Sequence, residues 1–165
     1  MTSTALQSPE NALSTQDATR IDDTRIGAVR PLITPALLQE WQPVAEQALA
    51  LVEQSRLAIS RILQGQDDRL VVVVGPCSIH DHDQALEYGR LLKQQADALA
   101  QDLLIVMRVY FEKPRTTVGW KGYINDPHLD GTFAINEGLQ MARRLLRELL
   151  ALGLPLGTEF LDLLS

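Results

Sequence analysis

The sequence is poor in cysteine, in basic residues and in long hydrophobic runs. Its one cysteine, Cys77, cannot form a disulfide within the chain, so the reducing cytoplasm is the expected compartment. Met1–Arg20 has no apolar core of the kind found in signal peptides, and no apolar run approaches the roughly 18 residues that a membrane-spanning helix needs. These absences predict a soluble, cytoplasmic protein with no membrane partner.

The chain also lacks a surplus of positive charge. Its 21 acidic and 15 basic residues give a formal net charge of −6, so no broad basic surface can attract a nucleic-acid backbone. Any anion that the protein binds must therefore be held by a local group of basic side chains. With 45% hydrophobic residues in a chain of 165, there is enough apolar material for a packed core.

Three regions differ in composition. Residues 1–25 are rich in Ser, Thr, Gln and Asp without a helical or strand period, which predicts a disordered tail. Residues 26–68 are predicted to form an arm followed by helices, because Thr34 and Pro35 give a helix start and apolar residues recur at helical spacing from Val44 to Gln64. Residues 69–165 form the third region, in which strands and helices alternate.

This third region reads as strand, helix, strand, helix, strand. Apolar strands are predicted to begin at Leu70, Leu103 and Leu156, the last running to Leu163, with helices over Asp83–Ala100 and Ile135–Leu152. A strand, a helix of this length and a second strand form a right-handed βαβ unit. The pattern predicts an α/β fold, either a sheet or a barrel, whose chemistry lies at the carboxyl ends of the strands.

A cluster of basic residues follows the second strand. Arg108, Lys113, Arg115 and Lys121 lie within fourteen residues, against one acid, Glu112. A run of charges is commonly just a solvated face. Arg108 differs, because it lies inside an apolar strand, where burial without an anionic partner is costly. A bound phosphate or carboxylate is the partner that we expect.

The loop from Glu112 to Thr132 is long for a connection between a strand and a helix, where about two to six residues is usual. It contains Trp120 and Tyr123 as well as turn residues, which predicts a folded excursion. The two aromatic side chains could stack on a ligand, but anchoring the loop to the body of the protein is the favoured interpretation.

Cys77 directly follows the first strand, after Gly75 and Pro76. A lone cysteine is often a small core residue. At the end of a parallel strand, near His80, it is equally a candidate for metal ligation or nucleophilic chemistry. No second cysteine or His-Glu cluster completes a metal site in this chain. Helix capping or surface solvation is predicted for the three histidines, which are His80, His82 and His128.

Two motifs, GPCSIH at Gly75–His80 and MRVYFEKPRTTVGWKG at Met107–Gly122, followed by INDPH and TEFLD, closely resemble the type I 3-deoxy-D-arabino-heptulosonate 7-phosphate (DAHP) synthases. The resemblance implies a (β/α)8 TIM barrel with an N-terminal helical extension, of which this chain holds about the first three strands. It also implies a transferase that opens the shikimate pathway of aromatic amino acid biosynthesis. The implied substrates are phosphoenolpyruvate and erythrose 4-phosphate, with a divalent metal of the Mn, Fe, Co or Zn class.

The resemblance further implies roles for individual residues. Cys77 is similar to the family's cysteine metal ligand. Arg108 and Lys113 are similar to the cations that bind phosphoenolpyruvate, and Lys113 is also the candidate catalytic residue, as a proton donor to the developing alkoxide. Erythrose 4-phosphate is expected on Arg115 and Thr116.

Glu159 is similar to a glutamate near the bound metal and phosphoenolpyruvate, although the sequence alone favours an ion pair equally. The family's other metal ligands, a His, a Glu and an Asp, lie further along such chains and are not in this one. The sequence is therefore expected to be a fragment that is inactive alone. The alternative is a non-catalytic interaction remnant, since the family's N-terminal arm and helices contribute to subunit contacts. A homo-oligomer and feedback inhibition by an aromatic amino acid are also implied.

Overall fold

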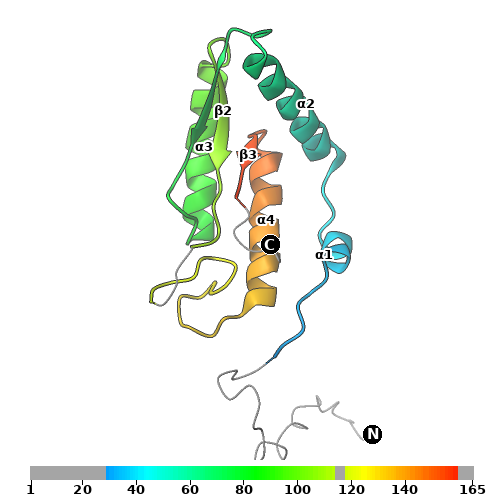
Figure 1. Ribbon diagram of the computed structural model, residues 1–165, viewed down its shortest axis with the longest axis vertical. Coiled ribbons are helices and arrows are strands. Elements are labelled where there is room, and N and C mark those ends of the chain that lie inside the picture. Colours follow the sequence, from blue (N-terminus) through cyan, green and yellow to red (C-terminus); the bar gives the residue numbers. More distant parts are fainter. Residues whose placement is uncertain (1–28, 114–117, 160–165) are drawn as a thin grey trace, which may run out of the picture. The chain divides into compact units, whose positions relative to one another are not determined.

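The computed structural model describes residues 29–113 and 118–159 (Figure 1). The chain divides into two units, Met1–Pro31 and Leu32–Ser165, and every described helix and strand belongs to the second. The tail predicted for residues 1–25 lies outside the described residues, as do residues 160–163 of the predicted third strand. Within the described residues this strand ends at Gly157, so its predicted continuation through Glu159 is wrong.

Two helices precede the sheet, α1 (Pro35–Trp41) and α2 (Glu46–Leu63). The predicted start of α1 is confirmed: the Thr34 side chain accepts a hydrogen bond from the Leu37 N–H over 3.3 Å, and Pro35 occupies the first turn. The longer α2 packs against α4 and against β1. Its packing partners could not be read from the sequence.

The sheet consists of β1 (Leu70–Val74), β2 (Leu103–Arg108) and β3 (Leu156–Gly157), parallel and in that order. Leu70 pairs with Leu103, and Met107 pairs with Leu156. The predicted α/β fold is thus confirmed, while closure into a barrel stays a prediction. All three strands run the same way, so their carboxyl ends lie at one edge.

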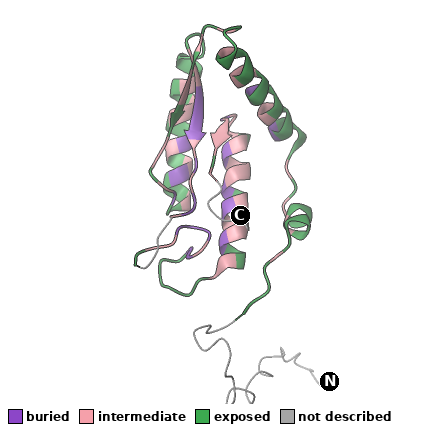
Figure 2. Ribbon diagram, viewed as in Figure 1, coloured by how far each residue is buried: buried purple, intermediate pink, exposed green. Residues whose placement is uncertain are grey.

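The two crossover helices are α3 (His82–Ala98) and α4 (Ile135–Ala151). The Asp81 carboxylate caps α3 by accepting a hydrogen bond from the Gln84 N–H over 2.8 Å. Side chains from both crossover helices pack with those of β2 in one hydrophobic core. The side of α4 that faces this core is buried (Figure 2). The fully buried members include Met107, Val109, Leu145, Leu149 and Leu154.

The loop after β2 doubles back on itself. Glu112 and Gly122 form an antiparallel bridge, and the Lys113 N–H donates to the Lys121 carbonyl over 3.1 Å. One step further, the Tyr123 N–H donates to the carbonyl of Phe111 over 2.6 Å. Gly122 has φ +109°, and a Cβ there would lie 2.3 Å from that carbonyl oxygen, so only glycine fits this close turn.

Aromatic residues anchor this loop, as the sequence predicted. Tyr123 is 1% exposed and stacks on Phe111 with ring centroids 6.0 Å apart. Burial raises the pKa of the Tyr123 phenol, and its hydroxyl has no hydrogen-bond partner among the described residues. The Trp120 indole N–H donates to the carbonyl oxygen of Asp126 over 2.8 Å. The described residues of the excursion are therefore folded against the core. Among the described helices, none is both long and apolar enough to span a bilayer.

Candidate active site

The side chains at the end of β2 alternate between two faces. Val109 and Phe111 are buried, at 0% and 5% exposure, and pack into the core. Arg108 and Tyr110 are partly exposed. Successive residues of an extended chain point to opposite faces, so Arg108 and Tyr110 share the face turned away from that core. The segment after β2 therefore packs one face into the core while its other face presents polar side chains.

The turn after β1 passes close to the end of β2. A Cβ added at Gly75 would lie 2.4 Å from the carbonyl oxygen of Arg108 and 2.9 Å from its Cβ. Any side chain at Gly75 would push this turn away from the strand. Glycine therefore allows the segment that carries Cys77 to lie against the segment that carries Arg108.

Arg108 is held by two uncharged groups. Its Nη2 donates a hydrogen bond to the Cys77 carbonyl over 3.3 Å, and its Cζ lies 3.9 Å from the centroid of the Tyr110 ring. Its Nε is buried and has no hydrogen-bond partner among the described residues. The guanidinium therefore keeps both its charge and part of its hydrogen-bonding capacity, as an anion site requires.

Lys113 reaches the same turn from the loop after β2. Its Nζ lies 3.0 Å from the Sγ of Cys77, which is an exposed residue. The antiparallel pairing with Lys121 fixes the Lys113 backbone, so the contact does not rest on the side chain alone. Three of the residues singled out in the sequence, Cys77, Arg108 and Lys113, are thus brought together at the carboxyl ends of β1 and β2.

Of the remaining predicted site residues, the structure describes only Glu159. Arg115 and Thr116 lie outside the described residues. Glu159 lines, together with Glu112 and Arg143, a cavity of about 200 Å³ whose lining contains none of the three clustered residues. The structure therefore leaves the predicted roles of Arg115, Thr116 and Glu159 as predictions.

The described residues do not complete a metal site. Within residues 29–113 and 118–159, no group of three or more His, Cys, Asp and Glu side chains is placed to hold a metal ion. Cys77 is a chemically suitable ligand for a soft or borderline metal, but a stable site commonly needs about three protein ligands. The described residues supply one, Cys77.

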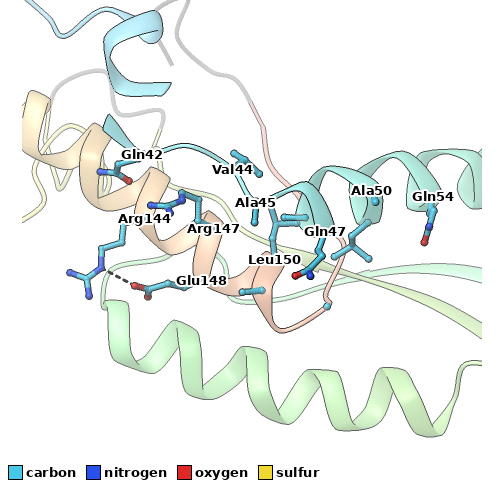
Figure 3. A pocket seen from close by; sticks show the side chains of 14 residues that line it. Gln42, Val44, Ala45, Gln47, Ala50, Gln54, Arg144, Arg147, Glu148 and Leu150 are labelled. Carbon is cyan, nitrogen blue, oxygen red and sulfur yellow. Dashed lines mark hydrogen bonds and ion pairs between the residues drawn. The ribbon is translucent and has the colours of Figure 1, made fainter. Parts of the chain in front are cut away.

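A second cavity lies away from the strand ends. About 780 Å³ of space lies between α2 and α4 (Figure 3), lined by small and apolar side chains with Gln42, Arg144, Arg147 and Glu148 at its polar parts. None of Cys77, Arg108 or Lys113 lines it. This cavity forms where α2 packs against α4, and it is separate from the cluster of Cys77, Arg108 and Lys113.

One side-chain contact joins the start of α3 to α4. Nε2 of His82 lies 2.7 Å from one oxygen of Glu148, whose other oxygen accepts a hydrogen bond from Arg144 Nε over 2.8 Å. The Arg144 hydrogen bond, and secondarily His82, hold the pKa of Glu148 below its usual value although partial burial opposes them. His82 and His128 have Glu148 and Glu137 as side-chain partners, and the helix-capping or surface-solvation roles predicted for the three histidines stay predictions.

Sequence reasoning missed two residues of the site, Gly75 and Tyr110. Tyr110 lies two positions after Arg108, and that spacing within an extended segment was the available signal that both side chains share a face. Gly75 gave a weaker signal. A glycine is required at position 75 because the backbone of Arg108 passes close to it. That approach depends on how β1 lies against β2, which the sequence alone does not specify.

The family model that matches this chain is described as the DAHP synthetase I family and covers residues 42–165. The tyrosine-inhibited phospho-2-dehydro-3-deoxyheptonate aldolase of Schizosaccharomyces pombe is 50% identical over 151 residues, which are 92% of this chain and 41% of that protein. The Phe-sensitive enzyme of Escherichia coli strain K12 is 54% identical over 144 residues, 87% of this chain and 41% of that protein. A third aldolase, from Amycolatopsis methanolica, is 54% identical over 142 residues, 86% of this chain and 70% of that protein.

A solved structure gives the same result. The phospho-2-dehydro-3-deoxyheptonate aldolase of Francisella tularensis SCHU S4 superposes with a TM-score of 0.79 at 51% identity, over 84% of this chain and 41% of that one. The chain spans about two fifths of the length of the S. pombe, E. coli and F. tularensis proteins. The matching family model, the sequence identity and the shared fold agree: the chain belongs to the DAHP synthetase I family.

Proposed function

We propose that the protein carrying this chain is a 3-deoxy-7-phosphoheptulonate synthase, which condenses phosphoenolpyruvate with erythrose 4-phosphate in the first step of the shikimate pathway. The observation that carries the proposal is the convergence of Arg108 and Lys113 on Cys77 at the ends of β1 and β2. In a chain of net charge −6, two cations at a strand end are a local device for binding an anionic substrate.

The reaction forms one carbon–carbon bond. C3 of phosphoenolpyruvate attacks the aldehyde carbon of erythrose 4-phosphate, and the aldehyde oxygen becomes an alkoxide that takes a proton. Water then adds at C2 and inorganic phosphate leaves, which gives the seven-carbon product. Arg108 binds and orients phosphoenolpyruvate, while the movable ammonium of Lys113 both binds it and donates the proton to the alkoxide.

Other parts of the site rest on the motif alone. Arg115 and Thr116 are proposed to hold the phosphate of erythrose 4-phosphate, and Glu159 to lie near the reacting groups. Cys77 is proposed as one ligand of a divalent metal whose remaining ligands come from outside the described residues. Such an ion supplies Lewis-acid activation of the aldehyde when it is bound.

Regulation and assembly are proposed from the relatives. The S. pombe protein is named tyrosine-inhibited and one E. coli protein Phe-sensitive. By analogy, we infer that an aromatic amino acid inhibits the protein carrying this chain. A homo-oligomer is proposed from the family resemblance of the sequence alone.

The test is phosphoenolpyruvate binding by calorimetry in the natural protein that carries this chain. Arg108→Ala should weaken binding at least about tenfold, because charge-assisted hydrogen bonds contribute about 1.5–3 kcal/mol. Arg90→Ala, an exposed change on α3, is the control and should leave the affinity unchanged. Unchanged affinity in Arg108→Ala would contradict the proposal.

The same variant separates the alternative, a non-catalytic interaction module. Under that alternative Arg108→Ala changes neither ligand binding nor oligomeric state, whereas under the proposal it changes only ligand binding. Residues 1–165 alone are expected to bind metal weakly and to consume no phosphoenolpyruvate, because the described residues hold no three-ligand group. Metal-dependent loss of phosphoenolpyruvate absorbance by that chain would contradict this expectation.

A further inference from the structure

Arg108 and Tyr110 form a stacked pair on one face of an extended segment. The Cζ of the guanidinium lies 3.9 Å from the centroid of the phenol ring, within the range of a cation–π contact. Val109, between them in sequence, is fully buried on the opposite face. The buried neighbour fixes the backbone, so the ring has a defined position beneath the guanidinium.

An aromatic face suits an anion-binding arginine better than a carboxylate would. A carboxylate binds the guanidinium in its plane through the N–H groups, which uses the donors that an anionic ligand needs and cancels the charge. A ring binds above the plane and leaves the N–H edge available. The described partners of Arg108 are this ring and the Cys77 carbonyl, and neither carries a charge.

The two partners together restrict the guanidinium. The Tyr110 ring lies against the guanidinium at 3.9 Å from Cζ to the ring centroid, and Nη2 is held by its hydrogen bond to the Cys77 carbonyl. An arginine side chain that is free to rotate loses about 2 kcal/mol of rotamer freedom when it is fixed. Holding it before the ligand arrives reduces that cost at the moment of binding.

We propose that Tyr110 is a positioning residue of the phosphoenolpyruvate site: its ring orients the Arg108 guanidinium for the substrate without competing for its hydrogen bonds. This inference rests on the function proposed above. It assigns no contact between Tyr110 and the substrate, because the effect passes through Arg108.

The test compares Tyr110→Leu with Tyr110→Phe in the natural protein that carries this chain, by calorimetry with phosphoenolpyruvate and with erythrose 4-phosphate. Tyr110→Leu removes the π face and should weaken phosphoenolpyruvate binding about tenfold, the upper part of the range for a cation–π contact. Erythrose 4-phosphate affinity should not change. Tyr110→Phe keeps the ring and should bind phosphoenolpyruvate within about threefold of the parent protein.

Two further variants make the outcome specific. Tyr88→Leu makes the same chemical change on α3, at a residue that is also partly buried, and should leave both affinities unchanged. In an Arg108→Gln background, Tyr110→Leu should have no further effect, since the residue through which it acts is gone.

Each failure has its own signature. If Arg108→Gln leaves phosphoenolpyruvate binding intact, the proposed function is wrong and the positioning role falls with it. If Arg108→Gln weakens binding but Tyr110→Leu does not, only the positioning role is overturned. It is also overturned if Tyr110→Leu weakens both substrates equally, or if Tyr110→Phe fails to restore binding, because those results indicate a general structural role.

Discussion

The backbone of Arg108 passes Gly75 so closely that a Cβ on that glycine would lie 2.4 Å from the Arg108 carbonyl oxygen. This approach joins the turn after β1 to the end of β2, and it sets the position of both cations relative to Cys77. Changes at Gly75 should therefore affect stability and the candidate site together.

Gly75→Ala is expected to lower the free energy of unfolding by about 1–3 kcal/mol, the usual cost of overpacking against atoms that cannot move aside. Urea unfolding measures it. The control is Gly157→Ala in β3, where the nearest contact of the added carbon is 3.4 Å to a Val106 methyl, so little loss is expected. Equal stability of the two variants would contradict this account of the β1–β2 approach.

Gly138→Ala should also be destabilising, although alanine favours a helix over glycine by about 1 kcal/mol. The added Cβ would lie 2.0 Å from the carbonyl oxygen of Ile124, so the first turn of α4 would have to move away from the loop. A net loss of about 1–3 kcal/mol is expected in urea unfolding.

Gly89→Ala on α3 is the matched control for that change. Its nearest contact is the Cδ2 of Leu149 at 2.6 Å, the far end of a flexible side chain that can shift. We expect this variant to lose clearly less stability than Gly138→Ala. A loss at Gly89 equal to that at Gly138 would indicate that the helix position, and not the backbone contact, decides the effect.

The contribution of Glu148 to stability is expected to be lost in acid. The Arg144 hydrogen bond depresses the pKa of Glu148 in the folded state, so its contribution is complete above the ordinary value of 4.5 and is lost as the pH falls through the lower folded value. Glu148→Gln should cost about 1 kcal/mol or less at pH 7, and the difference from the parent chain should shrink below pH 4.5. Urea unfolding as a function of pH tests this, with Glu53→Gln on α2 as the control. A difference that stays constant down to pH 3 would contradict it.

The stability contribution of His128 is expected to change with pH in the opposite direction to that of Glu148. Its hydrogen-bonded pairing with Glu137, with Nε2 to Oε2 at 3.0 Å, raises the pKa of His128 above the ordinary 6.5. The stabilisation from this pair is therefore present below pH 6.5 and is lost as the pH rises through the higher folded value. An NMR titration of His128 should have its midpoint above 6.5, and Glu137→Gln should return the midpoint toward 6.5. An unshifted midpoint in the parent chain would exclude the pairing in solution.

Local signals in the sequence predicted the elements well. Thr34 and Asp81 are helix caps because each hydroxyl or carboxylate lies three residues before the N–H that it accepts from, a relationship contained in a short window. The apolar stripe of α4 and the strand pattern of β1 and β2 are similarly short-range. The position of a cysteine, an arginine and a lysine after parallel strands was enough to predict one shared edge.

Contacts that depend on how elements pack were not predictable in the same way. The approach of Lys113 to Cys77 requires both the β1–β2 register and the hairpin that begins at Glu112. How α2 packs on α4 depends on the shapes of the contacting side chains, which the hydrophobic periodicity of the sequence does not specify. Glu159 and Arg115 were assigned by motif alone, and motif similarity carries no geometry.

The side chains that form the candidate site come from a short and continuous part of the chain. Cys77 and Lys113 are 36 positions apart, and every contact described among Cys77, Arg108, Tyr110 and Lys113 lies within residues 70–123. No residue of α4 or β3 makes any of these contacts. A substitution in either element is therefore expected to reach the candidate site only indirectly, through the core and the sheet that support β2.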